Sequence, residues 1–355
     1  MRYIFVFLFI TVVSFGQKKS NLSPEIWVDS VYNQLSFDEK VGQLFMVAAY
    51  SNKDEAHNKS LDKLIEENKI GGLIFFQGGP MRQAKLTNRY QAKSKVPLFI
   101  GIDAEWGLSM RLDSTYRYPW NMTLGAVQDM NLIEKAGNQM AKQSKRMGIQ
   151  FNFAPVVDIN TNPKNPIIGN RSFGETKENV TLRALALMKG LQDEGVYATA
   201  KHFPGHGLVT GDTHKSLQTI DGELKELGIY PPLIENGVLS IMIAHIAITN
   251  NKDYDSKGMP ATTSDTIVTK LLRNKLNFKG LIVTDAMNMG GVSQIKNAAV
   301  KTIDAGCDIM LMPLEIKIAY NEILNKYKAN EVFKLKVDNS VKRIVRMKIC
   351  LGLIK

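Results

Sequence analysis

The feature that most constrains the fold of this chain is a repeated alternation of short apolar runs with longer segments of helical periodicity. The runs are rich in Val, Ile, Phe and Met, and they span residues 41–49, 70–77, 97–103, 149–159, 196–203, 240–248, 280–287 and 308–313. The segments between them include amphipathic stretches at 131–147, 179–193, 264–276 and 295–305. This alternation is typical of repeated βα units.

Eight such units predict an α/β fold, a single (β/α)8 TIM-type barrel with parallel strands. Near-continuous apolar strands are expected where both faces of a parallel sheet are covered. An open doubly wound sheet is the alternative, but the Gly-rich phosphate-binding turn expected after its first strand is missing. Near the C-terminus, Ile344, Val345, Ile349 and Leu351 have helical spacing, which favours a last helix packed on the barrel. We therefore expect one barrel domain over residues 17–355.

The first sixteen residues have the layout of a secretory signal. Arg2 precedes an apolar run at 3–13, and small residues follow at Ser14 and Gly16. The run is short for a membrane span, which favours cleavage near Gly16 over an uncleaved N-terminal anchor. We therefore expect an exported chain, periplasmic or secreted, with no stable membrane insertion after cleavage.

The charge and the cysteines exclude several other classes of protein. A formal net charge of +11 would suit an anionic partner, but no nucleic-acid motif accompanies it, so we expect no nucleic-acid partner. Cys307 and Cys350 are the only cysteines, which excludes a disulfide-framed scaffold. Their apolar neighbours favour two buried thiols.

Polar residues fall at the ends of the predicted strands, where barrels of this type carry their active sites. The buried carboxylate expected in the run IVTDAM, Asp285, needs a basic partner or a polar pocket, because an unpartnered buried charge is costly. Capping of the following helix is the alternative role. The strand-end residues as a group are Asp103, Asp158, Lys201, His202, His245 and Asp285.

The segment KHFPGHGLVTGDTH at 201–214 has the composition of a functional site rather than of a simple turn. Asp212 and His214 are two residues apart and can hydrogen-bond through a tight turn, so that the carboxylate orients the imidazole for proton transfer. Three glycines in the segment would let this pair move toward a substrate and away from it. A solvent-exposed polar loop is the alternative.

Four motifs, in this order, resemble glycoside hydrolase family 3 and specifically its β-N-acetylglucosaminidase branch: IDAEWGLSMR, NRSFG, KHFPGHG followed by DTH, and GLIVTDAMNMGG. The matching segments run from about Leu35 to the C-terminus. The resemblance implies Asp285 as nucleophile and the pair Asp212–His214 as general acid/base, with no cofactor and no metal. The sugar-binding residues that it implies are Asp103, Arg111, Arg171, Lys201 and His202.

This family scheme implies retaining, exo-acting hydrolysis of a terminal β-linked N-acetylglucosamine residue. Asp285 would attack the anomeric carbon while protonated His214 protonates the departing oxygen, and the neutral imidazole would later activate water. Two departures from the usual motifs bear on the loops. Leu208 stands where the family usually has Asp, and IDAEWG replaces the commoner Gln-Glu-Gly-Gly, so that Trp106 becomes either a sugar platform or a core residue.

Two other functions are open at this point. A metal-dependent hydrolase would use ligands from His202, His206, Asp212, His214 and His245, but no His-x-His pair follows the first strand. A non-catalytic glycan-binding protein would keep the pocket and lose turnover. The sequence does not choose between peptidoglycan fragments and chitin-like oligosaccharides as substrates, nor between water and phosphate as the second acceptor.

Overall fold

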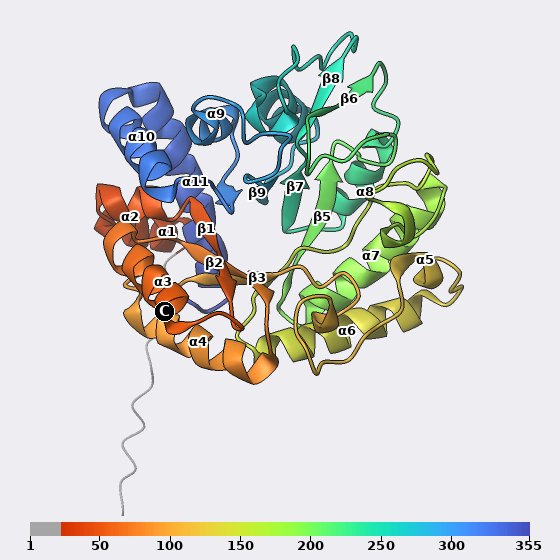
Figure 1. Cartoon of the computed structure of the whole chain (residues 1–355). Helices are drawn as coiled ribbons and strands as arrows, with labels where there is room; N and C mark the ends of the chain where they lie inside the picture. The colour runs from red at the N-terminus through yellow and green to blue at the C-terminus, as the bar shows by residue number, and fades with distance from the viewer. Residues whose placement is uncertain (1–22) are drawn as a thin grey trace, which may run out of the picture.

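The computed structural model describes residues 23–355 and contains a closed barrel of eight strands, all parallel. In their order around the barrel they are β1 (Phe45–Tyr50), β10 (Ile309–Leu311), β9 (Leu281–Ala286), β7 (Ser240–Ile243), β5 (Tyr197–Phe203), β4 (Phe151–Asn152), β3 (Phe99–Ile102) and β2 (Gly72–Gln77) (Figure 1). The predicted (β/α)8 barrel is confirmed, and the alternative of an open doubly wound sheet is wrong. The expected signal segment 1–16 lies outside the described residues.

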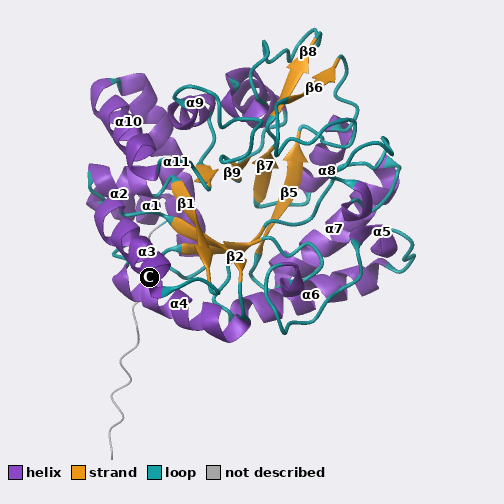
Figure 2. Ribbon diagram, viewed as in Figure 1, coloured by secondary structure: helices purple, strands orange, loops and turns teal. Residues whose placement is uncertain are grey.

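Helices form a ring outside the strands (Figure 2). Several begin at a side chain that caps the first turn, as Asp54, Asp129, Thr176 and Asn330 do. In chain order the helices are α1 (Pro24–Gln34), α2 (Phe37–Gly42), α3 (Glu55–Asn68), α4 (Pro80–Lys93), α5 (Asn121–Leu124), α6 (Met130–Arg146), α7 (Lys177–Asp193), α8 (Tyr230–Glu235), the π-helix η5 (Thr266–Lys275), α9 (Ala298–Ala305), α10 (Ile316–Ala329) and α11 (Glu331–Cys350), with short 3-10 turns η1 (Leu108–Met110), η2 (Gly169–Arg171), η3 (Leu227–Ile229) and η4 (Ala261–Thr263).

The predicted strand runs extend beyond the observed strands, and three of them show why. The run 41–49 begins in α2, which is held by a capping box between Ser36 and Glu39. In the run 149–159 only two residues join the barrel ladder, as β4. The run 240–248 divides into β7 and β8 (Ile246–Thr249), and β8 pairs with β6 (Gln218–Asp221) in a separate two-stranded sheet. At the start of β8, Ile246 packs in a small satellite cluster with Val209, whereas Ile248 is buried in the second of the two large core clusters.

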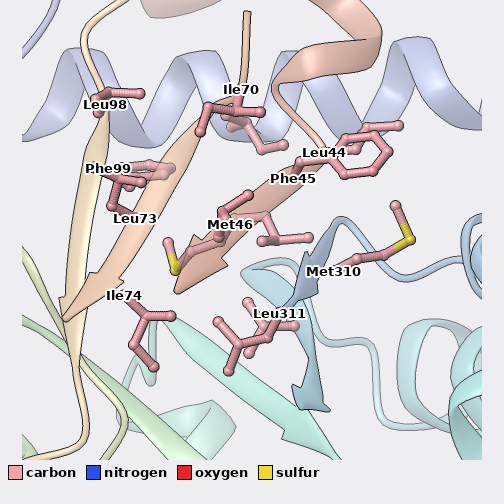
Figure 3. Close-up of a cluster of buried hydrophobic side chains, with 14 of the residues drawn as sticks. Leu44, Phe45, Met46, Ile70, Leu73, Ile74, Leu98, Phe99, Met310 and Leu311 are labelled. Carbon is pink, nitrogen blue, oxygen red and sulfur yellow. The ribbon is translucent and has the colours of Figure 1, made fainter. Parts of the chain in front are cut away.

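The largest apolar cluster lies around β1, β2, β3 and β10 (Figure 3). Burial of each such large side chain stabilises the fold by about 1.5–3 kcal/mol. Ile344 and Val345 of α11 are buried in the same cluster, and Ile349 and Leu351 pack against it. The predicted packing of the last helix on the barrel is thus confirmed. The residues that Figure 3 labels are Leu44, Phe45, Met46, Ile70, Leu73, Ile74, Leu98, Phe99, Met310 and Leu311.

Cys307 is buried as expected, whereas Cys350 is exposed at the end of α11, so the expectation of two buried thiols is wrong for the second cysteine. Cys350 lies on the solvent side of the final turn because Ile349 and Leu351 take the contacts with the core. Among residues 23–355, no helix combines the length and apolar character needed to span a bilayer.

Candidate active site

A cavity of about 250 Å³ opens among the carboxyl ends of the barrel strands. Of the eight residues to which the resemblance assigns a role, all but Asp212 line it, whereas the strand-end residues Asp158 and His245 do not. The lining members are Asp103, Arg111, Arg171, Lys201, His202, His214 and Asp285. Residues as far apart in the sequence as Asp103 and Asp285, which are separated by 182 positions, thus meet in one place, as the barrel fold requires of its active sites.

One side of the cavity is a chain of alternating charges. The carboxylate of Asp103 accepts from Arg111 Nη2 at 2.7 Å and from Lys201 Nζ at 2.8 Å. Lys201 also lies 2.8 Å from Glu105 Oε1, and Glu105 is bound through both oxygens by Arg171, at 2.9 and 2.8 Å. Such bidentate pairs fix orientation as well as charge. The network therefore presents rigid donors and acceptors to the cavity.

The titration of this network follows from its burial and its partners. Burial alone would raise the pKa of Asp103 and of Glu105, but the neighbouring cations outweigh it and hold both pKa values below the usual range. Burial would likewise lower the pKa of Lys201, yet the two carboxylates raise it. All three groups are accordingly charged at neutral pH.

His202 is oriented by Asp158, which is fully buried. His202 Nδ1 lies 2.7 Å from Asp158 Oδ2, and Arg171 Nη2 lies 3.4 Å from the other ring nitrogen. Because a carboxylate accepts and a guanidinium donates, the imidazole donates through Nδ1 and accepts through Nε2. Lys201 and His202 both line the cavity although they are consecutive in β5, at a point where the register of β5 against β7 shifts.

Asp285 is the penultimate residue of β9, and its carboxylate accepts the N–H of Ala286 at 2.8 Å. Burial would raise the pKa of Asp285, but His202, His245, the N–H of Ala286 and the cation of Lys201 together outweigh it and hold the pKa below its ordinary value. His245 lies 3.1 Å from the carbonyl of Ala286, to which it can only donate, and its other nitrogen contacts Thr262 at 2.9 Å. His245 thus holds the end of β9 in place and leaves Asp285 ionised and free on the cavity side.

Asp212 and His214 pair as the sequence predicted. His214 Nδ1 and its backbone N–H both lie 2.9 Å from Asp212 Oδ1. Burial slightly opposes the ionisation of Asp212, but the hydrogen bonds from His214 lower its pKa. Asp212 contacts His214 from outside the cavity, whereas the imidazole of His214 faces it. The geometry is that of a carboxylate that orients an imidazole.

The stretch in which Leu208 departs from the usual motif is held by neighbouring side chains. Glu226 accepts the N–H of Gly207 at 2.9 Å, and Asn165 donates to the carbonyl of His206 at 2.7 Å. Burial raises the pKa of Glu226 to about 8. Trp106 packs against Trp120 in a tilted arrangement, with 4.1 Å between ring centroids, and it is not among the residues that line the cavity.

Sequence reasoning missed Glu105, which is as central to the charge network as Asp103. The signal was an acidic residue two positions beyond a strand-end aspartate in an otherwise apolar turn. The histidines proposed as metal ligands have separate partners: Asp158, Thr213, Asp212 and Thr262. Within the described part of the chain, no group of three or more His, Cys, Asp or Glu side chains has the arrangement of a metal site.

Comparisons with known proteins extend this description. The family model "Glycosyl hydrolase family 3 N terminal domain" matches residues 36–347. Beta-hexosaminidase A of Pseudoalteromonas piscicida is 34% identical over 326 residues, which cover 81% of this chain and 54% of that protein. A solved glycoside hydrolase family 3 beta-N-acetylglucosaminidase from Paenibacillus is 34% identical, with a TM-score of 0.83 over 90% of this chain and 63% of that one. The beta-glucoside phosphorylase BglX is 27% identical, with a TM-score of 0.86 over 95% of this chain and 63% of that one. The chain thus spans between half and two thirds of the length of these relatives.

Proposed function

The chain belongs to glycosyl hydrolase family 3, and on this premise we propose that it removes terminal β-linked N-acetylglucosamine residues with retention of anomeric configuration. The observation that carries the proposal is the cavity itself. It brings an ionised carboxylate, Asp285, and an exposed imidazole, His214, to one cavity of about 250 Å³. The names of the similar hexosaminidases support the sugar, and the small volume supports cleavage at a chain end.

The proposed reaction has two steps. In the first, Asp285 attacks the anomeric carbon, the glycosidic C–O bond breaks, and His214 gives its proton to the departing oxygen. In the second, His214 takes a proton from water, the water oxygen attacks the anomeric carbon, and the ester bond to Asp285 breaks. The enzyme returns to its starting protonation state, and the product keeps the β configuration.

The charge network supplies the sugar contacts in this proposal. Asp103, Lys201 and Arg171 present acceptors and donors to hydroxyl groups, and their mutual ion pairs hold them in position before substrate binds. Asp212 has no direct contact with substrate and stabilises the imidazolium form of His214.

For the biological substrate we propose peptidoglycan fragments or chitin-like oligosaccharides outside the cytoplasm. The support is the layout of residues 1–16, which has the charge, apolar run and small residues of an export signal. A reporter fused after residue 22 should be exported, and retention in the cytoplasm would contradict this part of the proposal.

Product analysis tests the activity most directly. Defined oligosaccharides with terminal N-acetylglucosamine should release that sugar as the β anomer in buffer without phosphate. Asp285→Asn should abolish release while sugar binding remains measurable, and unchanged turnover would remove Asp285 as nucleophile. Retained binding with no turnover by the unmodified protein would instead indicate a glycan-binding protein.

Phosphorolysis is a second candidate, because one similar structure is named a beta-glucoside phosphorylase. In that reaction phosphate rather than water would attack the glycosyl–Asp285 intermediate. Parallel reactions with and without phosphate distinguish the two, because a phosphorylase yields the sugar 1-phosphate and slows when phosphate is removed.

A further inference from the structure

In the acid/base loop, defined here as residues 205–217, a buried residue stands between the two partly exposed members of the acid/base pair. The side chains of Asp212 and His214 are 26% and 58% exposed. Thr213 between them is 1% exposed. The residue that separates the two members of the acid/base pair is therefore its anchor to the protein body.

Three hydrogen bonds hold this anchor. Thr213 Oγ1 lies 2.9 Å from Nε2 of His206. The N–H of Gly290 donates to the carbonyl of His214 at 2.8 Å, and the N–H of Gly291 donates to the carbonyl of Thr213 at 3.1 Å. Gly290 and Gly291 follow Asp285 by five and six positions. The loop that carries the proposed proton donor, His214, is thus hydrogen-bonded to the segment that directly follows the proposed nucleophile, Asp285, in the chain.

Glycine is required at both positions because a side chain would collide with neighbouring atoms, and not because of the backbone conformation. A Cβ atom at Gly290 would lie 2.2 Å from the carbonyl oxygen of Lys215, which belongs to the loop. A Cβ atom at Gly291 would lie 2.9 Å from Cβ of His245 and 3.0 Å from its carbonyl oxygen. Neither glycine lies in the left-handed region. Any side chain at Gly290 must push the loop away.

His206 is itself rigidly placed, which makes it a suitable fixed point. It is 1% exposed, and its backbone N–H donates at 2.7 Å to Asp158, the carboxylate that also orients His202. Burial lowers the pKa of His206 to about 4, so its imidazole is neutral near neutral pH and can form a hydrogen bond with the hydroxyl of Thr213.

We propose that Gly290, Gly291 and His206 form a docking seat that sets the working position of the acid/base loop, so that His214 meets the departing oxygen opposite Asp285. These are positioning residues, since they act through the backbone of the loop and through Thr213. The inference rests on the proposed function, because it assigns the seat to the proton-donating step.

The test uses aryl N-acetylglucosaminides whose leaving groups range from dinitrophenol to unsubstituted phenol. General acid catalysis is typically worth about 10²–10⁴-fold, and only poor leaving groups need it. Gly290→Ala should lower kcat/KM for the phenyl substrate at least ~10-fold more than for the dinitrophenyl substrate. Gly228→Ala is the matched control, because its added methyl would meet only the flexible side chain of Lys177, at 3.4 Å from Cδ and 4.0 Å from Nζ. Gly228→Ala should leave kcat/KM nearly unchanged for both the phenyl and the dinitrophenyl substrate.

A second pair of variants tests the anchor with little change in volume. Thr213→Val removes the hydroxyl that contacts His206 and should show the same selective loss as Gly290→Ala. Thr213→Ser keeps the hydroxyl and should recover most of that loss. Thermal unfolding of each variant identifies any that lose the fold, and the valine variant then carries the test if the alanine variant does not fold.

His214→Ala separates failure of the seat from failure of the proposed function. If His214→Ala is selective for poor leaving groups while Gly290→Ala and Thr213→Val are not, the seat is refuted and the acid assignment stands. If His214→Ala itself slows all substrates equally, the acid assignment in the proposed function fails, and the seat with it.

Discussion

Replacing Lys348 with methionine should stabilise the protein at neutral pH and have almost no effect at pH 9. Lys348 lies on α11 with 0% exposure, and its Nζ donates to Gln43 Oε1 at 2.6 Å and to the carbonyl of Gly71 at 3.0 Å. Within the described residues it has no carboxylate partner among the ion pairs. Burial lowers its pKa from 10.5 to about 7.

The magnitude follows from this shift. The drop from 10.5 to about 7 corresponds to roughly 5 kcal/mol, at about 1.4 kcal/mol for each pH unit. The unfolded chain keeps the proton up to its ordinary pKa while the folded chain releases it near neutrality, so the folded state gains stability as pH rises. The destabilisation caused by the buried ammonium group is complete below the folded-state pKa and vanishes above the unfolded-state pKa. Between pH 7 and pH 9, deprotonation of Lys348 alone raises the free energy of unfolding by about 2 kcal/mol.

Methionine removes the charge but leaves two acceptors, in Gln43 and Gly71, without a donor, at a cost of about 1 kcal/mol each. The net expectation is roughly 2 kcal/mol of added stability at pH 7 and about none at pH 9. Chemical denaturation at both pH values measures it, with Lys328→Met as the control for an exposed lysine on α10. A variant less stable than the parent at pH 7, or a difference independent of pH, would refute the reasoning.

Three further outcomes are expected. Glu105→Gln should raise KM and lower kcat/KM by about tenfold or more, because Arg171 loses its charged partner at the proposed sugar site; an unchanged kcat/KM for a short aryl substrate would exclude this role. Because the folded-state pKa of Glu105 is depressed, the stability that it contributes should persist above about pH 4.5 and be lost at more acid pH, and the Gln variant should lose less stability on acidification in a pH-resolved unfolding series. Dialysis against a chelator should leave the rate with aryl substrates unchanged, and a loss restored by added zinc would instead support the metal-dependent alternative.

The fold was predictable because each βα unit repeats one physical pattern, an apolar strand followed by an amphipathic helix. The prediction failed where apolar residues serve a different cluster. The run 240–248 reads as one strand, yet Ile246 turns away to pack with Val209 and Ile220 beside β6. A sequence does not show which buried surface a short apolar run will meet.

The candidate site was predictable to the extent that strand ends converge in a closed barrel. This logic led to Asp103, Lys201, His202 and Asp285. The spacing of Asp212 and His214 indicated their pairing, and the resemblance assigned that pair the acid/base role. The contact between the acid/base loop and Gly290 could not be predicted from the sequence. It joins His214 and Gly290, which are 76 positions apart, through backbone groups that carry no sequence signal. The role of Glu105 likewise depends on Arg171, 66 positions away.

The central claim is that Asp285 forms a covalent bond to the anomeric carbon while the acid/base loop serves the opposite side. Incubation with a fluorinated N-acetylglucosaminyl fluoride, which forms the intermediate faster than it is hydrolysed, followed by peptide mass spectrometry, tests it directly. The account predicts one sugar attached to the peptide that contains Asp285, and none on Asp285→Asn. A label on another carboxylate, or turnover of the reagent with no covalent species on the intact protein, would contradict it.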